Sequence, residues 1–113
     1  MYEYIKGLLV EISPTYAIID CNGVGYKAEI SLQTYTSFLS KQNHPVLLYL
    51  YQIIREDAHL LFGFSDTKER ELFRMLISVS GIGANTARTM LSASSSAEIE
   101  ENIRSANVAA LKN

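Results

Sequence analysis

The segment around Gly81-Ile82-Gly83 joins two stretches of helical periodicity, the form of a helix–hairpin–helix. Glycine permits positive φ and carries no side chain to block close approach, which suits Gly81 and Gly83 to a tight bend. Ile82 is expected to be buried between the two helices, and Ala87 is small enough for them to pack closely. The second helix would then begin with outward-facing backbone N–H groups, which form a site for an anion such as a DNA phosphate.

We predict that phosphate contacts come from the hairpin and the turn after it, and that Arg88, one turn into the second helix, adds a charged contact. Such contacts position a duplex without reading its bases. The alternative is a plain turn between helices, because Gly-x-Gly is also a common way to end a helix. The predicted DNA-binding residues of this segment are Gly81, Ile82, Gly83, Ala84, Asn85 and Arg88.

A second group of charged residues forms the predicted turn Arg55-Glu56-Asp57-Ala58. A solvated hairpin tip is the simpler interpretation. The functional interpretation is electrostatic, because two adjacent carboxylates repel phosphate and would keep duplex arms apart. Glu56, Asp57 and His59 also carry cation-binding groups, but their spacing matches no recognised metal site. We predict neither a metal nor a cofactor.

The composition restricts the possible functions. The net charge of −2 argues against DNA binding through bulk charge, so a DNA hypothesis depends on local geometry. The sequence contains no discernible Ser/His/Asp or Cys/His arrangement and no phosphate-binding loop of nucleotide hydrolases, so we do not expect an enzyme. No apolar run is long enough to span a membrane, and the N-terminus does not resemble a secretory signal. With its single cysteine, Cys21, the chain fits a reducing cytoplasm.

The first half of the chain is predicted to be a five-stranded barrel of the OB type, with a short helix between the third and fourth strands. Asn22-Gly23 is a strong signal for a two-residue hairpin turn. Another kind of five-stranded barrel remains open from the pattern alone. The expected strands are 4–12, 15–20, 25–30, 46–54 and 59–64, and the expected helix is 31–40.

The second half changes to a helical period. Asp66-Thr67-Lys68-Glu69 has the form of a capping box, in which Glu69 reaches back to the amide of Asp66. Helices are expected from there to about residue 79, then over 85–93, 97–104 and 108–112, and Ser95 with Glu98 would form a second capping box. The predicted class is therefore α+β, with an OB-type barrel over residues 1–64 and an all-α helix–hairpin–helix domain over residues 65–113.

The chain resembles the RuvA family, the Holliday-junction-binding subunits of the bacterial RuvAB branch-migration machine. The resemblance spans nearly the whole chain in the same order. It is carried by Asn22-Gly23-Val24-Gly25-Tyr26, Arg55-Glu56-Asp57-Ala58-His59-Leu60-Leu61-Phe62-Gly63-Phe64, Glu69-Arg70-Glu71-Leu72-Phe73, and Gly81-Ile82-Gly83 with Ala87.

This resemblance implies a homotetramer with a concave face that holds a four-way junction in an open, square form. Glu56 and Asp57 would form an acidic pin at its centre, and Arg55 would lie close to the DNA backbone. The implied partners are Holliday junction DNA, the RuvB ATPase, which supplies motor activity in branch migration, and the RuvC resolvase. The subunit itself would be a non-catalytic part of recombination and repair.

The chain also departs from the family pattern. Many relatives have Pro-Lys where Ala84-Asn85 stands here, so a basic contact is absent and Arg88 would compensate. The chain stops at Asn113, about where a second hairpin should begin, so we expect a truncated fragment without the domain that contacts RuvB.

Two other functions remain open from the sequence. In the second hypothesis, behind junction binding, the chain is a protein-interaction module whose helical half packs on a partner and has no DNA role. Helix–hairpin–helix elements also occur in DNA repair enzymes, which need a catalytic carboxylate or lysine beyond the hairpin. The nearest acids, Glu98, Glu100 and Glu101, follow an ordinary solvated-face pattern.

Overall fold

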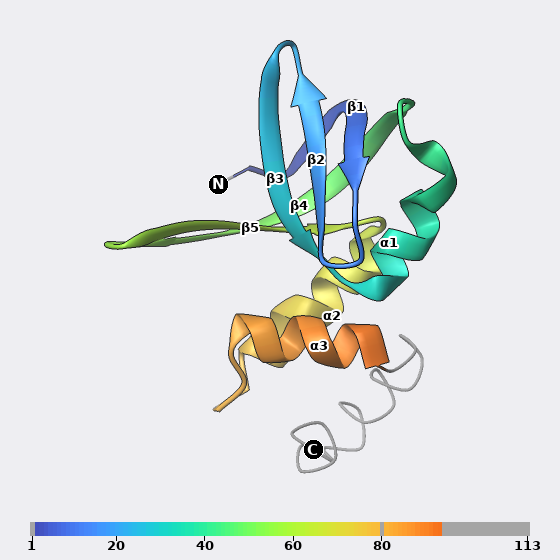
Figure 1. Ribbon diagram of the computed structural model, residues 1–113. Helices are drawn as coiled ribbons and strands as arrows, with labels where there is room; N and C mark the ends of the chain where they lie inside the picture. The colour runs from blue at the N-terminus through green and yellow to red at the C-terminus, as the bar shows by residue number, and fades with distance from the viewer. Residues whose placement is uncertain (1, 80, 94–113) are drawn as a thin grey trace.

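In the part of the chain that the structure describes, five strands form a closed barrel in the order β1-β2-β3-β5-β4, and two helices follow it (Figure 1). The computed structural model describes residues 2–79 and 81–93. This architecture confirms the predicted OB-type barrel followed by helices. The elements are β1 (Tyr4–Ile12), β2 (Tyr16–Cys21), β3 (Val24–Ile30), α1 (Leu32–Phe38), a 3₁₀ turn (Leu39–Lys41), β4 (Pro45–Arg55), β5 (Ala58–Phe64), α2 (Thr67–Ile77) and α3 (Ala84–Ala93).

The β2–β3 turn is the two-residue hairpin that its sequence predicts. Asn22 and Gly23 both have positive φ, 53° and 90°, as a type I′ turn requires. The Gly23 amide donates to the carboxylate of Asp20 at 2.7 Å. The turn chemistry therefore sets the register of this hairpin, from Cys21 opposite Val24 to Tyr16 opposite Glu29.

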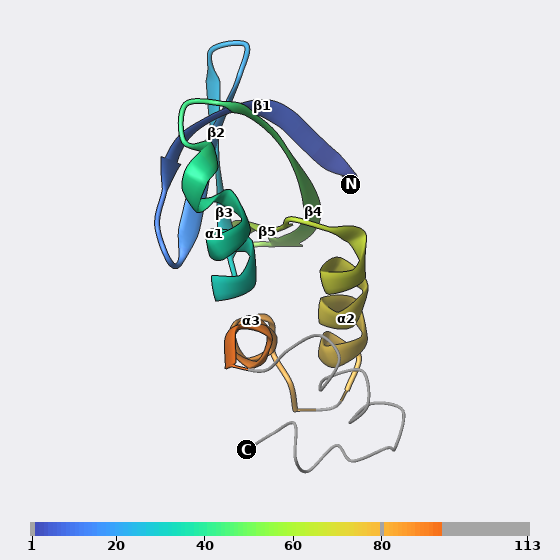
Figure 2. The same cartoon turned by 90° about the vertical axis from the view of Figure 1, so that its right-hand side faces the viewer.

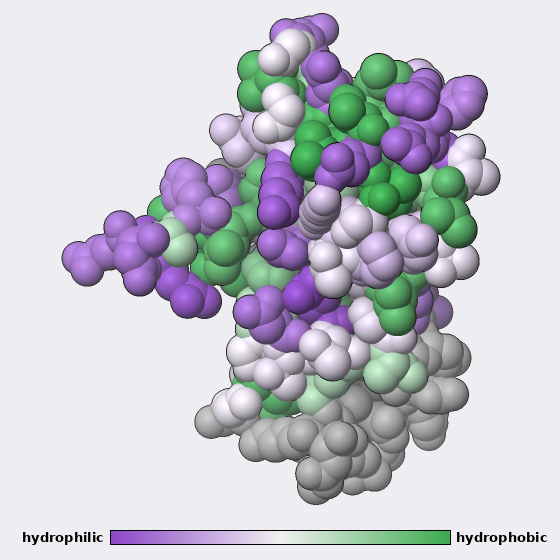
Figure 3. Space-filling view, viewed as in Figure 1, coloured by the Kyte–Doolittle hydropathy of each residue, from purple (hydrophilic) through white to green (hydrophobic). Residues whose placement is uncertain are grey.

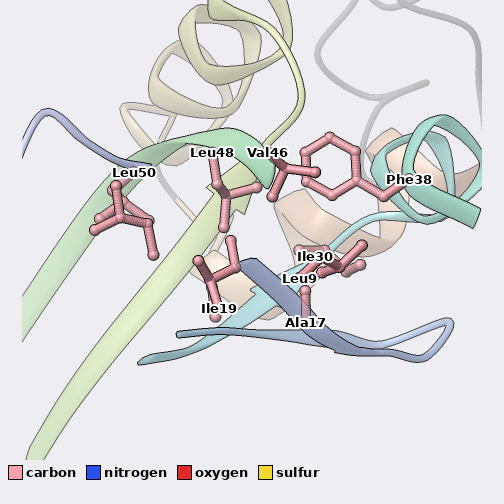
Figure 4. Packing of buried hydrophobic residues seen from close by; sticks show 10 residues of the cluster. Leu9, Ala17, Ile19, Ile30, Phe38, Val46, Leu48 and Leu50 are labelled. Atoms are coloured by element: carbon pink, nitrogen blue, oxygen red, sulfur yellow. The ribbon is translucent and has the colours of Figure 1, made fainter. Parts of the chain in front are cut away.

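The barrel is filled by aliphatic side chains that alternate along its strands and point inward (Figure 4). Phe38, from the end of α1, joins this cluster and is 3% exposed. The helical insert therefore covers one end of the barrel with an aromatic side chain. Fully buried members of the cluster are Leu9, Ala17, Ile19, Ala28, Leu48 and Leu50.

The barrel closes where β5 pairs in parallel with β3, through Glu29 opposite Phe62 and Ile30 opposite Gly63. β4 and β5 stay paired beyond this closure, as far as Arg55 opposite Ala58. The two strands therefore project from the barrel as a ribbon, on the left of Figure 1. The end of this ribbon is covered by hydrophilic residues (Figure 3).

A second core joins the ribbon to the helices beneath the barrel (Figure 2). Phe73 of α2 is fully buried at its centre, with ring centroids 5.1 Å from both Phe62 and Phe64 and 5.5 Å from Tyr51. Leu91 of α3 is also fully buried in this cluster. β5 therefore contributes to both cores, with Phe62 and Phe64 in this one and the partly buried Leu61 against the barrel core.

The start of α2 contains one of the two hydrogen bonds of the predicted capping box and lacks the other. Asp66 accepts a hydrogen bond from the Glu69 amide at 2.7 Å, as a capping residue should. The predicted return bond from Glu69 to Asp66 was wrong, because the Glu69 carboxylate accepts from Ser31 and Thr34 of the α1 region. Those partners are distant in sequence and invisible to a local pattern.

The predicted helices at 97–104 and 108–112, with the capping pair Ser95 and Glu98, lie outside the described residues. Within the described part of the chain, no helix is long and apolar enough to cross a membrane.

Two glycines in the strands on either side of β2, Gly7 in β1 and Gly25 in β3, differ in the room available for a side chain. A Cβ on Gly7 would lie 2.3 Å from the carbonyl oxygen of Asp20, whereas one on Gly25 meets nothing closer than Ile18 at 3.7 Å. We expect Gly7→Ala to cost about 1–3 kcal/mol, because the backbones of β1 and β2 must separate. Gly25→Ala should be nearly neutral. Urea denaturation of both variants measures the difference, and equal stability would contradict the close approach at Gly7.

Candidate nucleic-acid interface

The connection between α2 and α3 forms the bend that the sequence predicts. Gly81 adopts positive φ, 87°, whereas Gly83 does not, so only the first glycine uses its conformational freedom. Ile82 is 5% exposed and Ala87 is fully buried, both in the cluster around Phe73. The side chain of Ile82 thus anchors the bend, as expected, and leaves the backbone of Gly81 and Gly83 exposed.

The free amides are not all where the sequence predicted them. The Ile82 N–H donates to the carbonyl of Val79 at 3.1 Å and is therefore not available to a ligand. The first bond of α3 runs from the Ala87 amide to the Gly83 carbonyl, 2.9 Å. The amides of Ala84, Asn85 and Thr86 precede this bond and have no earlier carbonyl in the helix to accept from them. The available donors therefore lie in the first turn of α3.

The surroundings of these amides suit an anion. A Cβ built on Gly83 meets no atom of the described residues within 4 Å, its chain neighbours aside, so this part of the chain leaves the approach to the bend open. Asn85 and Thr86 are exposed, and the first turn of α3 holds no acidic residue. The partial positive charge at this helix start is therefore not opposed by a neighbouring carboxylate in that turn.

Arg88 lies away from these amides. Its guanidinium donates to the carbonyls of Thr15 at 3.1 Å and Ile30 at 3.4 Å, and it pairs with Glu29 at 3.6 Å. The side chain thus ties α3 to the barrel. These contacts all use Nη1 of the guanidinium, and the predicted phosphate contact of Arg88 stays a prediction.

The charged turn occupies the end of the β4–β5 ribbon, with Arg55, Glu56 and Asp57 all exposed. In Figure 1 this tip and the α2–α3 bend lie on the same side of the molecule. Over residues 2–79 and 81–93, no group of three His, Cys, Asp or Glu side chains could hold a metal ion. The structure therefore brings the partially positive start of α3 and an acidic tip to one side of the described chain, at separate places.

A buried polar cluster, which sequence reasoning missed, connects the elements that carry the tip and the bend. It consists of Ser31, Thr34 and Glu69, which are at most 1% exposed, and is called the Glu69 cluster below. The Ser31 hydroxyl donates to Glu69 Oε2 at 2.6 Å, and the Thr34 hydroxyl donates to Glu69 Oε1 at 2.7 Å. Thr34 Oγ1 also accepts from the amide of Ser65, 3.0 Å away, between β5 and α2.

Further polar contacts reinforce this connection on either side. The Leu32 amide donates to the hydroxyl of Ser92 at 3.0 Å, joining α1 to α3. Arg70 of α2 pairs with Glu3 at 3.1 Å and lies over the ring of Tyr49. The helices are thus attached to the barrel by directional bonds as well as by apolar packing.

The ionisation of Glu69 should be visible in the stability of the protein. Burial raises the pKa of the Glu69 carboxyl, while the hydroxyl donors Ser31 and Thr34 lower it and nearby Asp66 raises it. A raised folded-state pKa means that the folded state binds more protons than the unfolded state between the two pKa values. The contribution of Glu69 to the free energy of unfolding is therefore highest at low pH and falls as pH rises through this window.

We expect wild type to gain stability relative to Glu69→Gln when pH falls from about 7 to about 5. Urea denaturation of both proteins at each pH measures this difference, in which the titration of all other groups cancels. A difference that stays constant, or grows as pH rises, would contradict the raised pKa.

Comparison with known proteins gives the family. A model described as the RuvA N terminal domain matches residues 1–63, and one described as a SAM-like helix-hairpin-helix tandem matches residues 73–113. The chain is 56% identical over 112 residues to the "Holliday junction branch migration complex subunit RuvA" of Bacteroides thetaiotaomicron, covering 99% of this chain and 55% of the relative.

Proteins of the same name from other organisms are also similar to this chain over nearly its whole length. Identity is 53% with that of Parabacteroides distasonis, over 98% of this chain and 56% of the relative. It is 46% with that of Christiangramia forsetii, over 99% of this chain and 57% of the relative. The chain thus spans somewhat more than half the length of the relatives it matches. The family model of the RuvA N terminal domain matches more than half of this chain. The chain therefore belongs to the RuvA family.

Proposed function

We propose that this chain is the junction-binding part of a RuvA subunit, which holds four-way DNA open for branch migration. The observation that carries the proposal is the unopposed set of amides at the start of α3, on the same side as the acidic ribbon tip. The names of the relatives, subunits of a Holliday junction branch migration complex, support the same substrate.

The proposed phosphate contacts are made by backbone N–H groups and not by charged side chains. The amides of Ala84, Asn85 and Thr86 donate to phosphate oxygens, with Gly81 shaping the bend and Gly83 leaving it open, and the helix dipole adds electrostatic attraction. Because these contacts read no base edges, binding depends on the shape of the DNA and not on its sequence. This mechanism is compatible with a chain whose net charge is −2.

The ribbon tip has the opposite role in this proposal. Glu56 and Asp57 repel phosphates and prevent strands from closing over the centre of the junction, while Arg55 contacts the backbone beside them. One unit charge at 10 Å from a phosphate contributes only about 0.4 kcal/mol in water. Four subunits around the crossover would place eight carboxylates there, so the effect requires the homotetramer that we also propose.

In this scheme the barrel, residues 1–64, carries the pin and the helical domain, from residue 65, carries the phosphate grip. The subunit performs no catalysis of its own. The RuvB ATPase would supply the movement of DNA, and the RuvC resolvase would act on the junction held in the open form. Family membership supports these partners and the tetramer, which we propose together with junction binding.

The phosphate grip is tested by placing a charge at Gly83. We expect Gly83→Glu to weaken junction binding by at least about tenfold, because a carboxylate about 5 Å from a phosphate costs up to about 3 kcal/mol at an effective dielectric constant of 20. The backbone there is unstrained and the space is open, so the variant should fold. Affinity is measured by gel shift with the full-length protein.

Two controls separate charge from position. Gly83→Ala adds bulk without charge and should weaken binding much less. Gly25→Glu adds the same charge on the barrel, at another exposed glycine, and should leave the affinity nearly unchanged. Equal losses in Gly83→Glu and Gly25→Glu would show that net charge, and not the bend, determines binding.

The pin is tested with Glu56→Gln and Asp57→Asn together. Removing both charges should raise affinity for linear duplex, since the repulsion is lost, and reduce the preference for a four-way junction over duplex. The matched control is Glu71→Gln, which removes an exposed charge from α2. An unchanged preference in the double variant would leave no electrostatic role for the tip.

A protein-interaction module without DNA contact predicts a different result. DNA binding through phosphates weakens steeply as salt concentration rises. Titration of wild type with junction DNA at several salt concentrations therefore separates the two functions. No retention of junction DNA at low salt would favour the interaction module.

A further inference from the structure

The Glu69 cluster is buried at the place where three elements meet. Ser31 precedes α1 and accepts from the Thr34 amide at 3.3 Å, so one hydroxyl both caps α1 and donates to Glu69 of α2. Thr34 connects in the other direction, to the amide of Ser65 at the end of β5. Five polar groups thus form one connected set of hydrogen bonds, 2.6 to 3.3 Å long, between the barrel and the helical domain.

This arrangement is a costly way to join two domains. Burying a carboxylate is unfavourable unless strong hydrogen bonds offset the loss of water, and apolar residues of similar size are often as stable or more so. Adhesion is already provided by Phe73 against Phe62 and Phe64. Apolar contact is not directional, whereas hydrogen bonds restrict both distance and angle. The cluster therefore adds orientation where adhesion already exists.

A small rotation of the ribbon at the cluster produces a large displacement at its far end. The seven residues of β5 extend about 20 Å from Phe64 to the tip. A rotation of about 10° at the α2 end would move the tip by roughly 3–4 Å, whereas a productive binding constellation tolerates about 0.5 Å. A small change of angle at the cluster would thus move the acidic tip too far for the tip and the α2–α3 bend to contact the same DNA.

We propose that Glu69, held by Ser31 and Thr34, is a positioning residue for junction binding, which sets the angle between the β4–β5 ribbon and the α2–α3 bend. The inference depends on the proposed function, since it assumes that tip and bend act on the same DNA. The residues of the cluster do not touch DNA themselves.

The test uses full-length protein with Thr34→Val, which keeps the shape of the side chain and removes its hydroxyl, and with Glu69→Gln. Thr34→Ser restores the hydroxyl and is the conservative rescue. Glu71→Gln, exposed on the same helix, is the control for charge. Affinities for a four-way junction and for linear duplex are measured for each variant, together with melting temperature.

A second measurement reports the angle directly. Spin labels on cysteines at His59 and Thr89, both exposed, give the distance between ribbon and α3 after Cys21 is replaced by serine. Labelled subunits are diluted with unlabelled ones, so that distances within one subunit dominate. We expect a single narrow distance in wild type and in Thr34→Ser.

The expected result for Thr34→Val and Glu69→Gln is a broader or shifted distance and junction affinity lower by at least about tenfold, with duplex affinity changed less than about twofold. Should Glu69→Gln fail to fold, Thr34→Val, which removes a single hydroxyl, decides alone. Unchanged distances, or equal losses for junction and duplex, would overturn the inference. A wild type without junction preference would instead overturn the proposed function, and this inference with it.

Discussion

The double use of β5 is the constraint on which the rest of this structure depends. The strand closes the barrel through its parallel pairing with β3, and it also presents Phe62 and Phe64 to Phe73 of α2. The segment from Phe62 to Phe64 cannot shift without disturbing the barrel closure or the second core. Because β5 also forms half of the ribbon, the packing that holds the domains together places the acidic tip. The strand thus links stability to the geometry of the site.

The candidate site consists largely of backbone, which would let an acidic chain bind DNA as we propose. Amides at a helix start carry partial positive charge that does not appear in any count of side chains. Their exposure follows from the burial of Ile82 and Ala87, which pull the bend against the second core and leave the first turn of α3 facing outward. Hydrophobic packing at two residues therefore produces an electrostatic site at their neighbours.

Arg88 and Glu69 illustrate how charged residues join two units. Arg88 satisfies barrel carbonyls, and Glu69 accepts from two hydroxyls of the α1 region. Each contact requires the desolvation of a charged side chain, but its hydrogen bonds restrict direction as well as distance. The two domains therefore meet at a defined angle. A purely apolar boundary would hold the units together with less control over that angle.

The sequence alone was sufficient for features that depend on neighbouring residues. Asn22-Gly23 specified its turn, Asp66 its cap, and the change from strand to helical period separated the barrel from the helices. It was insufficient wherever partners are far apart in the chain. The Ile82 amide proved to be occupied, and Glu69 bonded to residues 35 and 38 positions away instead of closing its own capping box. Local patterns encode backbone conformation because it is decided by adjacent residues, whereas the partner of a buried polar group is chosen only when distant elements come into contact.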